Sequence, residues 1–139
     1  MIGGCRCGNI SVELTLTQAP EAYTARRCLC SFCTERAVLY VSDPNGLYQI
    51  TIADDAVVER KRFGTQTADF MVCGKCDGFI GAVCDTPTGR RAVVNLKCLS
   101  EGNTLTTKIQ DFDYDAETVE QRLARRGRNW TPVAVTIKG

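Results

Sequence analysis

Nine cysteines and no histidine limit what this chain of 139 residues can fold into. Without histidine, the chain cannot build a Ser-His-Asp triad, a Cys-His pair, an HExxH zinc site or a two-Cys, two-His finger. Nine is an odd number, so the cysteines cannot all pair internally. The first residues lack both the basic opening and the apolar stretch of a signal peptide. We therefore expect a cytoplasmic protein whose reduced cysteines bind metal.

Seven of the cysteines fall into three tight groups. Cysteines one or two residues apart can chelate a single ion, whereas a disulfide across such a short spacing would be strained. Seven ligands make one closed site of four and one open site of three, and an open site leaves a position for water or substrate. The groups are Cys5 and Cys7, then Cys28, Cys30 and Cys33, then Cys73 and Cys76.

The middle group has three cysteines within six residues, so it can supply the open site by itself. We predict that Cys28, Cys30 and Cys33 hold a zinc ion with an open coordination position. The remaining four would hold a structural zinc ion, namely Cys5, Cys7, Cys73 and Cys76. The spacing alone also allows Cys28 and Cys30 to join the last pair.

Cys84 and Cys98 stand alone in segments that resemble strands. We expect both to be small core residues, since a free cysteine is among the most buried residue types. A fourth ligand from either one would close the open site. With Cys28, Cys30 and Cys33, either could also hold an iron–sulfur cluster.

The sequence predicts a single domain, residues 1–139, with a mainly β, antiparallel fold and one short C-terminal helix. Residues 10–16 alternate apolar and polar side chains, as in a half-buried strand. A helix over 116–126 is expected, with Asp115 as its cap and Gly127 just beyond its end. Trp130 is expected in the core. Further strands are predicted at 37–41, 47–52, 57–63, 68–72, 78–84, 91–99, 105–112 and 133–137.

The composition argues against two kinds of partner. The formal net charge is +1, and binding to nucleic acid usually needs a clear basic excess. The longest apolar runs, 37–41 and 79–84, are far shorter than the ~20 residues needed to cross a bilayer. We therefore expect neither a nucleic acid nor a membrane as partner.

Three motifs together resemble the glutathione-dependent formaldehyde-activating enzymes, also called the aldehyde-activating or centromere-protein-V-like family. These motifs are Gly3-Gly4-Cys5-Arg6-Cys7-Gly8, the group Cys28 to Cys33, and Val72-Cys73-Gly74-Lys75-Cys76-Asp77, followed by a late strand, Val93 to Leu99. Asp77 and Val72 depart from the family's usual Gly and Phe. Asp tolerates a positive φ better than most residues, so the turn can survive.

The resemblance implies an Mss4-like fold with zinc knuckles and two zinc ions, one structural and one catalytic. It also implies a carbon–sulfur lyase that reversibly adds glutathione to formaldehyde. We expect the partners to be glutathione or another small thiol, and formaldehyde or another small aldehyde. The alternative is a non-catalytic, zinc-stabilised protein-interaction module, in which Cys84 or Cys98 fills the fourth position of the open site.

The basic residues nearest the open site in sequence are candidates for binding an anionic cosubstrate. They are Arg26, Arg27 and Arg36. A second basic cluster, Arg122, Arg125, Arg126 and Arg128, could meet the carboxylates of glutathione. The favoured interpretation is a solvated helix end that complements the helix dipole. Without histidine, proton transfer would fall to Glu35, Tyr40, an Asp or water.

Overall fold

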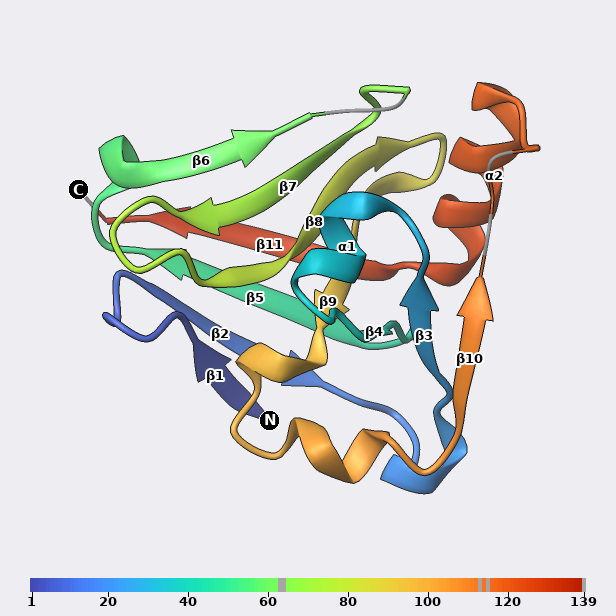
Figure 1. Cartoon of the computed structure of the whole chain (residues 1–139), viewed down its shortest axis with the longest axis horizontal. Helices are drawn as coiled ribbons and strands as arrows, with labels where there is room; N and C mark the ends of the chain where they lie inside the picture. The colour runs from blue at the N-terminus through green and yellow to red at the C-terminus, as the bar shows by residue number, and fades with distance from the viewer. Residues whose placement is uncertain (63–64, 113, 115, 139) are drawn as a thin grey trace.

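A computed structural model describes residues 1–62, 65–112, 114 and 116–138, and within these residues the fold is mainly β, as predicted (Figure 1). The two α-helices among them are α1 (Ser31–Glu35) and α2 (Val119–Asn129). Short 3-10 turns cover Pro20–Ala22, Asp55–Val57, Leu96–Cys98 and Gly102–Leu105. The strands are β1 (Ile2–Gly4), β2 (Ile10–Thr15), β3 (Ala25–Cys28), β4 (Tyr40–Val41), β5 (Leu47–Ile52), β6 (Val58–Lys61), β7 (Ala68–Cys73), β8 (Phe79–Thr86), β9 (Gly89–Asn95), β10 (Ile109–Phe112) and β11 (Thr131–Ile137).

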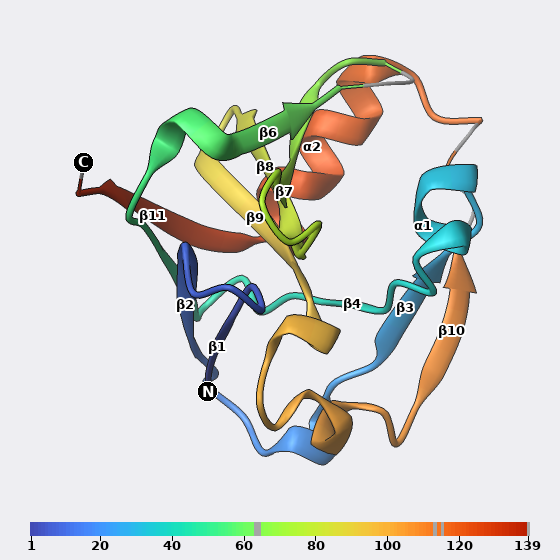
Figure 2. The ribbon, with the colours of Figure 1, turned by 60° about the vertical axis from the view of Figure 1, so that its left-hand side comes forward.

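All of these strands belong to one curled, half-barrel sheet (Figure 2). Strands β6 to β9 form a consecutive antiparallel array. Strand β11 connects this array to β5, β2 and β1, and β4 connects β9 to β3 and β10. No helix in the described part of the chain is long and apolar enough to span a membrane.

The sheet is mixed, so the expectation of purely antiparallel pairing was wrong at two places. Strand β10 pairs with β3 in parallel, and β11 pairs with β5 in parallel. Parallel neighbours need a crossover of a dozen or more residues, and long stretches of chain separate the two strands of each pair. The alternation of side chains that we used to predict strands is blind to strand direction.

The apolar pattern places the core as expected. Ile10, Val12 and Leu14 of β2 are buried while the residues between them are exposed. Trp130, predicted to be a core residue, is also buried. It belongs to a cluster with Cys33, Tyr40 and other residues, separate from the larger cluster beneath β2 and β5.

Several predicted strands are shorter than expected. The strand at 37–41 shrinks to β4, since Ala37, with a positive φ of 49°, and Val38, whose N–H donates to Cys33 O, belong to the turn after α1. The one at 91–99 ends at Asn95, whose side chain accepts a hydrogen bond from Lys97 N and starts a 3-10 turn. Only the last four residues of 105–112 form a strand, and 57–63 yields β6, residue 63 lying outside the described residues.

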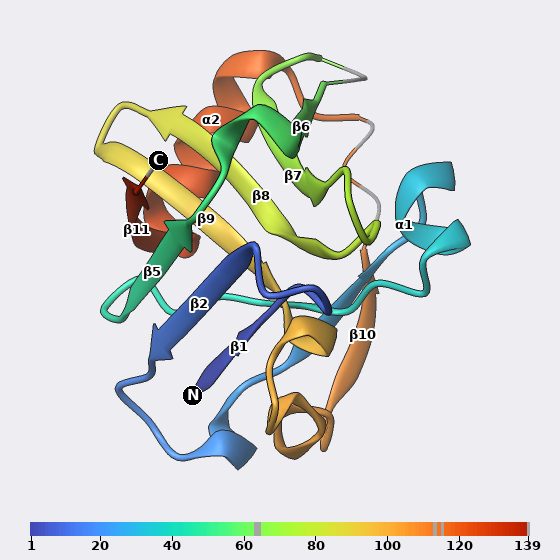
Figure 3. The same ribbon diagram turned by 90° about the vertical axis from the view of Figure 1, so that its left-hand side faces the viewer.

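Helix α2 begins and ends three residues later than predicted. Thr118 caps it through a capping box with Gln121, whereas the predicted cap, Asp115, lies outside the described residues. Gly127 lies inside the helix rather than beyond it. A Cβ there would approach Thr88 Oγ1 to 2.9 Å, so this glycine lets α2 lie close against β8 and β9 (Figure 3).

Candidate functional site

Four cysteines from two distant segments meet in one group that could hold a metal ion. Cys5 and Cys7 lie between β1 and β2, whereas Cys73 ends β7 and Cys76 lies in the turn that follows. The four Sγ atoms lie within 4.8 Å of one another. Cys7 Sγ is 3.6 Å from both Cys5 Sγ and Cys73 Sγ. The structure therefore groups these four cysteines together, as in the predicted partition, and keeps Cys28 and Cys30 with Cys33.

Backbone amides shape this four-cysteine group. Ile10 N donates to Cys5 Sγ at 3.2 Å. The amides of Cys7 and Gly78 stabilise the Cys76 thiolate, which lowers the pKa of Cys76 to about 6 despite some burial. Burial instead raises the pKa of Cys5 to about 11. These hydrogen bonds therefore favour the thiolate form of Cys76, which is the form that binds a metal ion.

The turn after β7 tolerates the unusual Asp77, as expected from the sequence. Asp77 takes a positive φ of 61°, the left-handed region that Asp enters more readily than most residues. Its main-chain N–H donates to Cys73 O at 2.8 Å, which closes the turn. The next residue, Gly78, has no room for a side chain, because a Cβ would lie 2.7 Å from Cys5 Cβ.

The second group consists of the three cysteines of the middle motif. Cys28 ends β3, Cys30 precedes α1, and Cys33 lies within α1, where Thr34 N donates to Cys30 O at 2.9 Å. Their Sγ atoms also lie within 4.8 Å of one another, so this group too could hold a metal ion. Cys33 is buried, and the other two are half-buried.

Neither of the two isolated cysteines belongs to a group. Cys84 is buried in the core, where its Sγ lies 3.5 Å from Arg126 Nη1. Cys98 packs against the main core, 3.6 Å from Tyr48 Oη. Among the described residues, the second group therefore offers three ligands rather than four.

Tyr40 lies beside the three-cysteine group. Its Oη is 3.0 Å from Cys33 Sγ, and its ring packs edge-on against Phe79. Burial, followed by the charges of the neighbouring cysteines, raises the pKa of Tyr40. Its hydroxyl is therefore protonated at neutral pH. Glu35 was the other residue named as a candidate for proton transfer. Its side chain is exposed and makes no comparable contact with a cysteine among the described residues.

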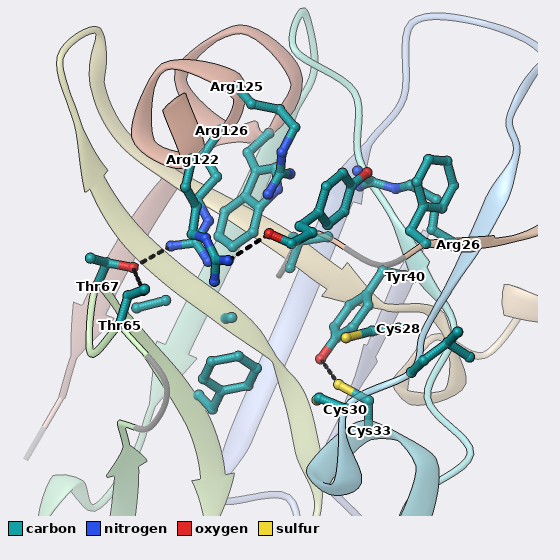
Figure 4. A pocket seen from close by; sticks show the side chains of 18 residues that line it. Arg26, Cys28, Cys30, Cys33, Tyr40, Thr65, Thr67, Arg122, Arg125 and Arg126 are labelled. Carbon is teal, nitrogen blue, oxygen red and sulfur yellow. Dashed lines mark hydrogen bonds between the residues drawn. The ribbon is translucent and has the colours of Figure 1, made fainter. Parts of the chain in front are cut away.

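A pocket of about 240 Å³ opens next to this group (Figure 4). The three cysteines and Tyr40 lie on one side of it, and Arg122, Arg125 and Arg126 of α2 lie on the opposite side. Between them the lining is mainly apolar and aromatic. It includes Phe70, Ala82, Val93, Phe112 and Trp130.

One of the three arginines predicted to bind an anionic cosubstrate lies in this pocket. Arg26 lines it, with Nη2 2.6 Å from Ser42 Oγ. Arg27 is the next residue of β3, so it faces the other side of the strand, where it pairs with Asp111 at 3.3 Å. Arg36 lies over the Phe32 ring and 3.9 Å from Asp77, outside the pocket lining.

The interpretation of the second basic cluster as a solvated helix end was wrong for three of its four members. Arg126 is buried and Arg122 and Arg125 are half-buried, and only Arg128 is exposed. The spacing of Arg122, Arg125 and Arg126 could have indicated this, because residues three and four apart share one face of a helix. Their burial follows from the way α2 lies against β8 and β9.

Comparison with known proteins supports the fold. No family model matches the sequence. No curated protein matches it either. Among solved structures, the chain is similar to the crystal structure of a Rhodobacter sphaeroides protein from a structural genomics programme. The two share 24% sequence identity at a TM-score of 0.58, over 78% of this chain and 98% of the other. At this identity, the similarity establishes a shared fold only. Any inference about chemistry must come from the two cysteine groups and the pocket.

Proposed function

We propose that this protein is a zinc-dependent carbon–sulfur lyase that reversibly adds a small thiol, glutathione or a similar one, to formaldehyde or another small aldehyde. The observation that carries the proposal is the division of seven ligands into four and three, with the group of three opening into a pocket. The resemblance of the three cysteine motifs to the formaldehyde-activating family supports the same reaction.

The sulfur positions fit zinc. Tetrahedral zinc with Zn–S bonds of ~2.3 Å places its sulfur ligands ~3.8 Å apart. The Sγ distances from Cys7 to Cys5 and Cys73 are both 3.6 Å in the structure. In this proposal Cys5, Cys7, Cys73 and Cys76 hold a structural zinc ion, and Cys28, Cys30 and Cys33 hold a catalytic one. A zinc ion with three thiolates and an open position can bind a thiol as its thiolate or polarise an aldehyde oxygen.

The chain's own residues then position and protonate the reactants. In the forward reaction a C–S bond forms, and the thiol proton ends on the former carbonyl oxygen. The reverse reaction breaks the same bond. Tyr40 Oη, 3.0 Å from Cys33 Sγ, is placed to donate a hydrogen bond to that oxygen. The apolar lining excludes water and holds both reactants close together, which raises the rate by proximity.

The test combines metal analysis with a measurement of exchange. Freshly purified protein should contain two zinc ions per chain. It should also accelerate exchange between free formaldehyde and its thiol adduct, followed by NMR exchange spectroscopy. Cys30→Ser should lose this acceleration and keep the fold, whereas Cys98→Ala, outside both groups, should keep both. One zinc ion per chain, or unchanged exchange in Cys30→Ser, would rule out the proposal.

A further inference from the structure

The pocket carries far more positive than negative charge. Four guanidinium groups line it, those of Arg26, Arg122, Arg125 and Arg126. Among the described residues, Glu117 is the carboxylate that pairs with this set. Arg125 donates to both of its oxygens, at 2.9 and 3.0 Å, and this contact lowers the pKa of Glu117. The carboxylate is therefore ionised and is committed to Arg125.

Arg126 is the most unusual of the four, because it is 7% exposed and has no carboxylate partner among the described residues. Its Nη1 donates to Thr67 Oγ1 at 2.8 Å and contacts Cys84 Sγ at 3.5 Å. Its Nε is buried and has no hydrogen-bond partner within the described residues. Burying a charged group without a counter-ion is costly, so the site gains free energy when an anion arrives.

Arg122 also has a guanidinium nitrogen without a hydrogen-bond partner among the described residues. Its Nη2 donates to Tyr114 O at 2.9 Å, but its Nε makes no hydrogen bond within the described residues and lies 3.9 Å from Glu117. Figure 4 shows Arg122 and Arg126 side by side at the wall opposite the three cysteines. Two neighbouring guanidinium groups that line one wall of a pocket are well suited to an oxyanion.

The rest of the pocket fixes how an anion would lie. A zinc ion with three thiolates carries a net charge of −1, so the three-cysteine side repels an anionic group that the arginine side attracts. The apolar wall between the two sides suits a short hydrocarbon segment. The volume of about 240 Å³ is just below the ~300–1,000 Å³ usual for drug-sized ligands, which favours a small molecule.

We propose that the pocket binds a small organic acid, with its carboxylate on Arg122 and Arg126 and its thiol or aldehyde group at the three cysteines. This inference rests on the proposed function for the identity of the reacting group. The carboxylate site itself rests on the position of Arg122 and Arg126 in the pocket.

Binding can be measured separately from turnover, because the single tryptophan, Trp130, lines the pocket beneath Arg126 and reports on it by fluorescence. Zinc-loaded protein should bind butyrate at least about tenfold more tightly than 1-butanol, the size of effect expected for charge-assisted hydrogen bonds. Arg122→Gln and Arg126→Gln should abolish this preference. Arg128→Gln changes an exposed residue of the same helix and should keep it.

Arg122→Gln decides the test if the more buried Arg126→Gln fails to fold. Equal binding of butyrate and 1-butanol, or an equal loss in Arg128→Gln, would overturn the inference.

Two further experiments identify which substrate carries the carboxylate. Exchange with formaldehyde is compared for 3-mercaptopropionate and 2-mercaptoethanol, and exchange with 2-mercaptoethanol is compared for glyoxylate and acetaldehyde. One acid should react faster than its neutral counterpart, and only while Arg122 is intact.

The two proposals fail in different ways. If neutral pairs exchange but neither acid is preferred, the lyase function stands and the carboxylate site is wrong. If butyrate binds through Arg122 but no pair exchanges, the carboxylate site stands and the lyase function is wrong.

Discussion

Tyr40 Oη and Cys33 Sγ lie 3.0 Å apart at the wall of the pocket. Strand β4 places Tyr40 directly opposite Arg26 of β3, and helix α1 brings Cys33 to the same place. A protonated hydroxyl thus stands next to the sulfur group where the proposed reaction occurs.

Tyr40→Phe should slow exchange while leaving the fold intact. The ring keeps its edge-on contact with Phe79, and the change removes only the oxygen. Removing one hydrogen-bond donor to a developing oxyanion typically costs ~10²–10³-fold, so we expect at least about a tenfold fall in kcat with little change in KM. NMR exchange rates and thermal unfolding would be measured together. Glu35→Gln is the matched control, since Glu35 is exposed and outside the pocket lining, and it should leave the rate unchanged.

The cysteine groups were predictable because their ligands are set by short spacing. Cys28, Cys30 and Cys33 meet within one turn of chain, so local geometry alone brings their sulfurs together. The pairing of Cys5 and Cys7 with Cys73 and Cys76 needs the sheet as well. It followed from counting, because the middle group already accounts for three of the seven ligands.

Carboxylate binding by the arginine cluster was only the second interpretation of the sequence, because the position of these arginines in the pocket depends on tertiary structure. Whether Arg122 and Arg126 face solvent or the protein depends on which face of α2 lies against β8 and β9. Likewise, Arg27 was included among the candidates for binding an anionic cosubstrate because the strand over residues 25–28 was not predicted. Once β3 is known, alternation places Arg26 and Cys28 on one face and Arg27 on the other.

Loss of one ligand should unfold the chain in the four-cysteine group but leave it folded in the three-cysteine group. Small cysteine zinc sites contribute about 10–16 kcal/mol, comparable to the ~5–15 kcal/mol stability of a whole domain. Cys73→Ser should therefore leave the chain unfolded, since its group joins residues 5–7 to the turn after β7. Cys30→Ser should remain folded with one zinc ion. Circular dichroism and zinc content measure both outcomes, and a folded Cys73→Ser with unchanged melting would contradict the assignment.

Asp43 should make stability depend on pH in the acid range. Its buried carboxylate would have a raised pKa from burial alone, but hydrogen bonds from Tyr23, Thr17 and Asn45 outweigh this effect and lower the pKa to about 2. Because the folded-state pKa is depressed, the stabilisation is complete above the ordinary value near 4 and is lost as pH falls toward 2. The difference amounts to about 2 kcal/mol, of which about half is lost by pH 3.

The measurement follows the carboxyl ¹³C NMR shift of Asp43, assigned by its loss in Asp43→Asn, between about pH 7 and pH 4.5 with excess zinc, because stronger acid would release the zinc ions. With a pKa of about 2, the shift should stay flat over this range. A shift that already moves as the pH falls below about 5 would mean that Asp43 titrates normally.

Cobalt substitution should distinguish the open group from the closed one. Co²⁺ accepts the same thiolate ligands as Zn²⁺, and its visible absorption changes with the number and kind of its ligands. If the three-cysteine group keeps an open position, adding 2-mercaptoethanol to the cobalt-loaded protein should change the absorption of one ion and leave that of the other unchanged. Cys30→Ser should remove the responding ion and keep the spectrum of the four-cysteine group. Cys84→Ala and Cys98→Ala should respond like the native chain, because neither residue lies in the group. If adding 2-mercaptoethanol leaves the whole absorption spectrum unchanged, a fourth ligand already closes the second site. The non-catalytic alternative would then account better for the two cysteine groups.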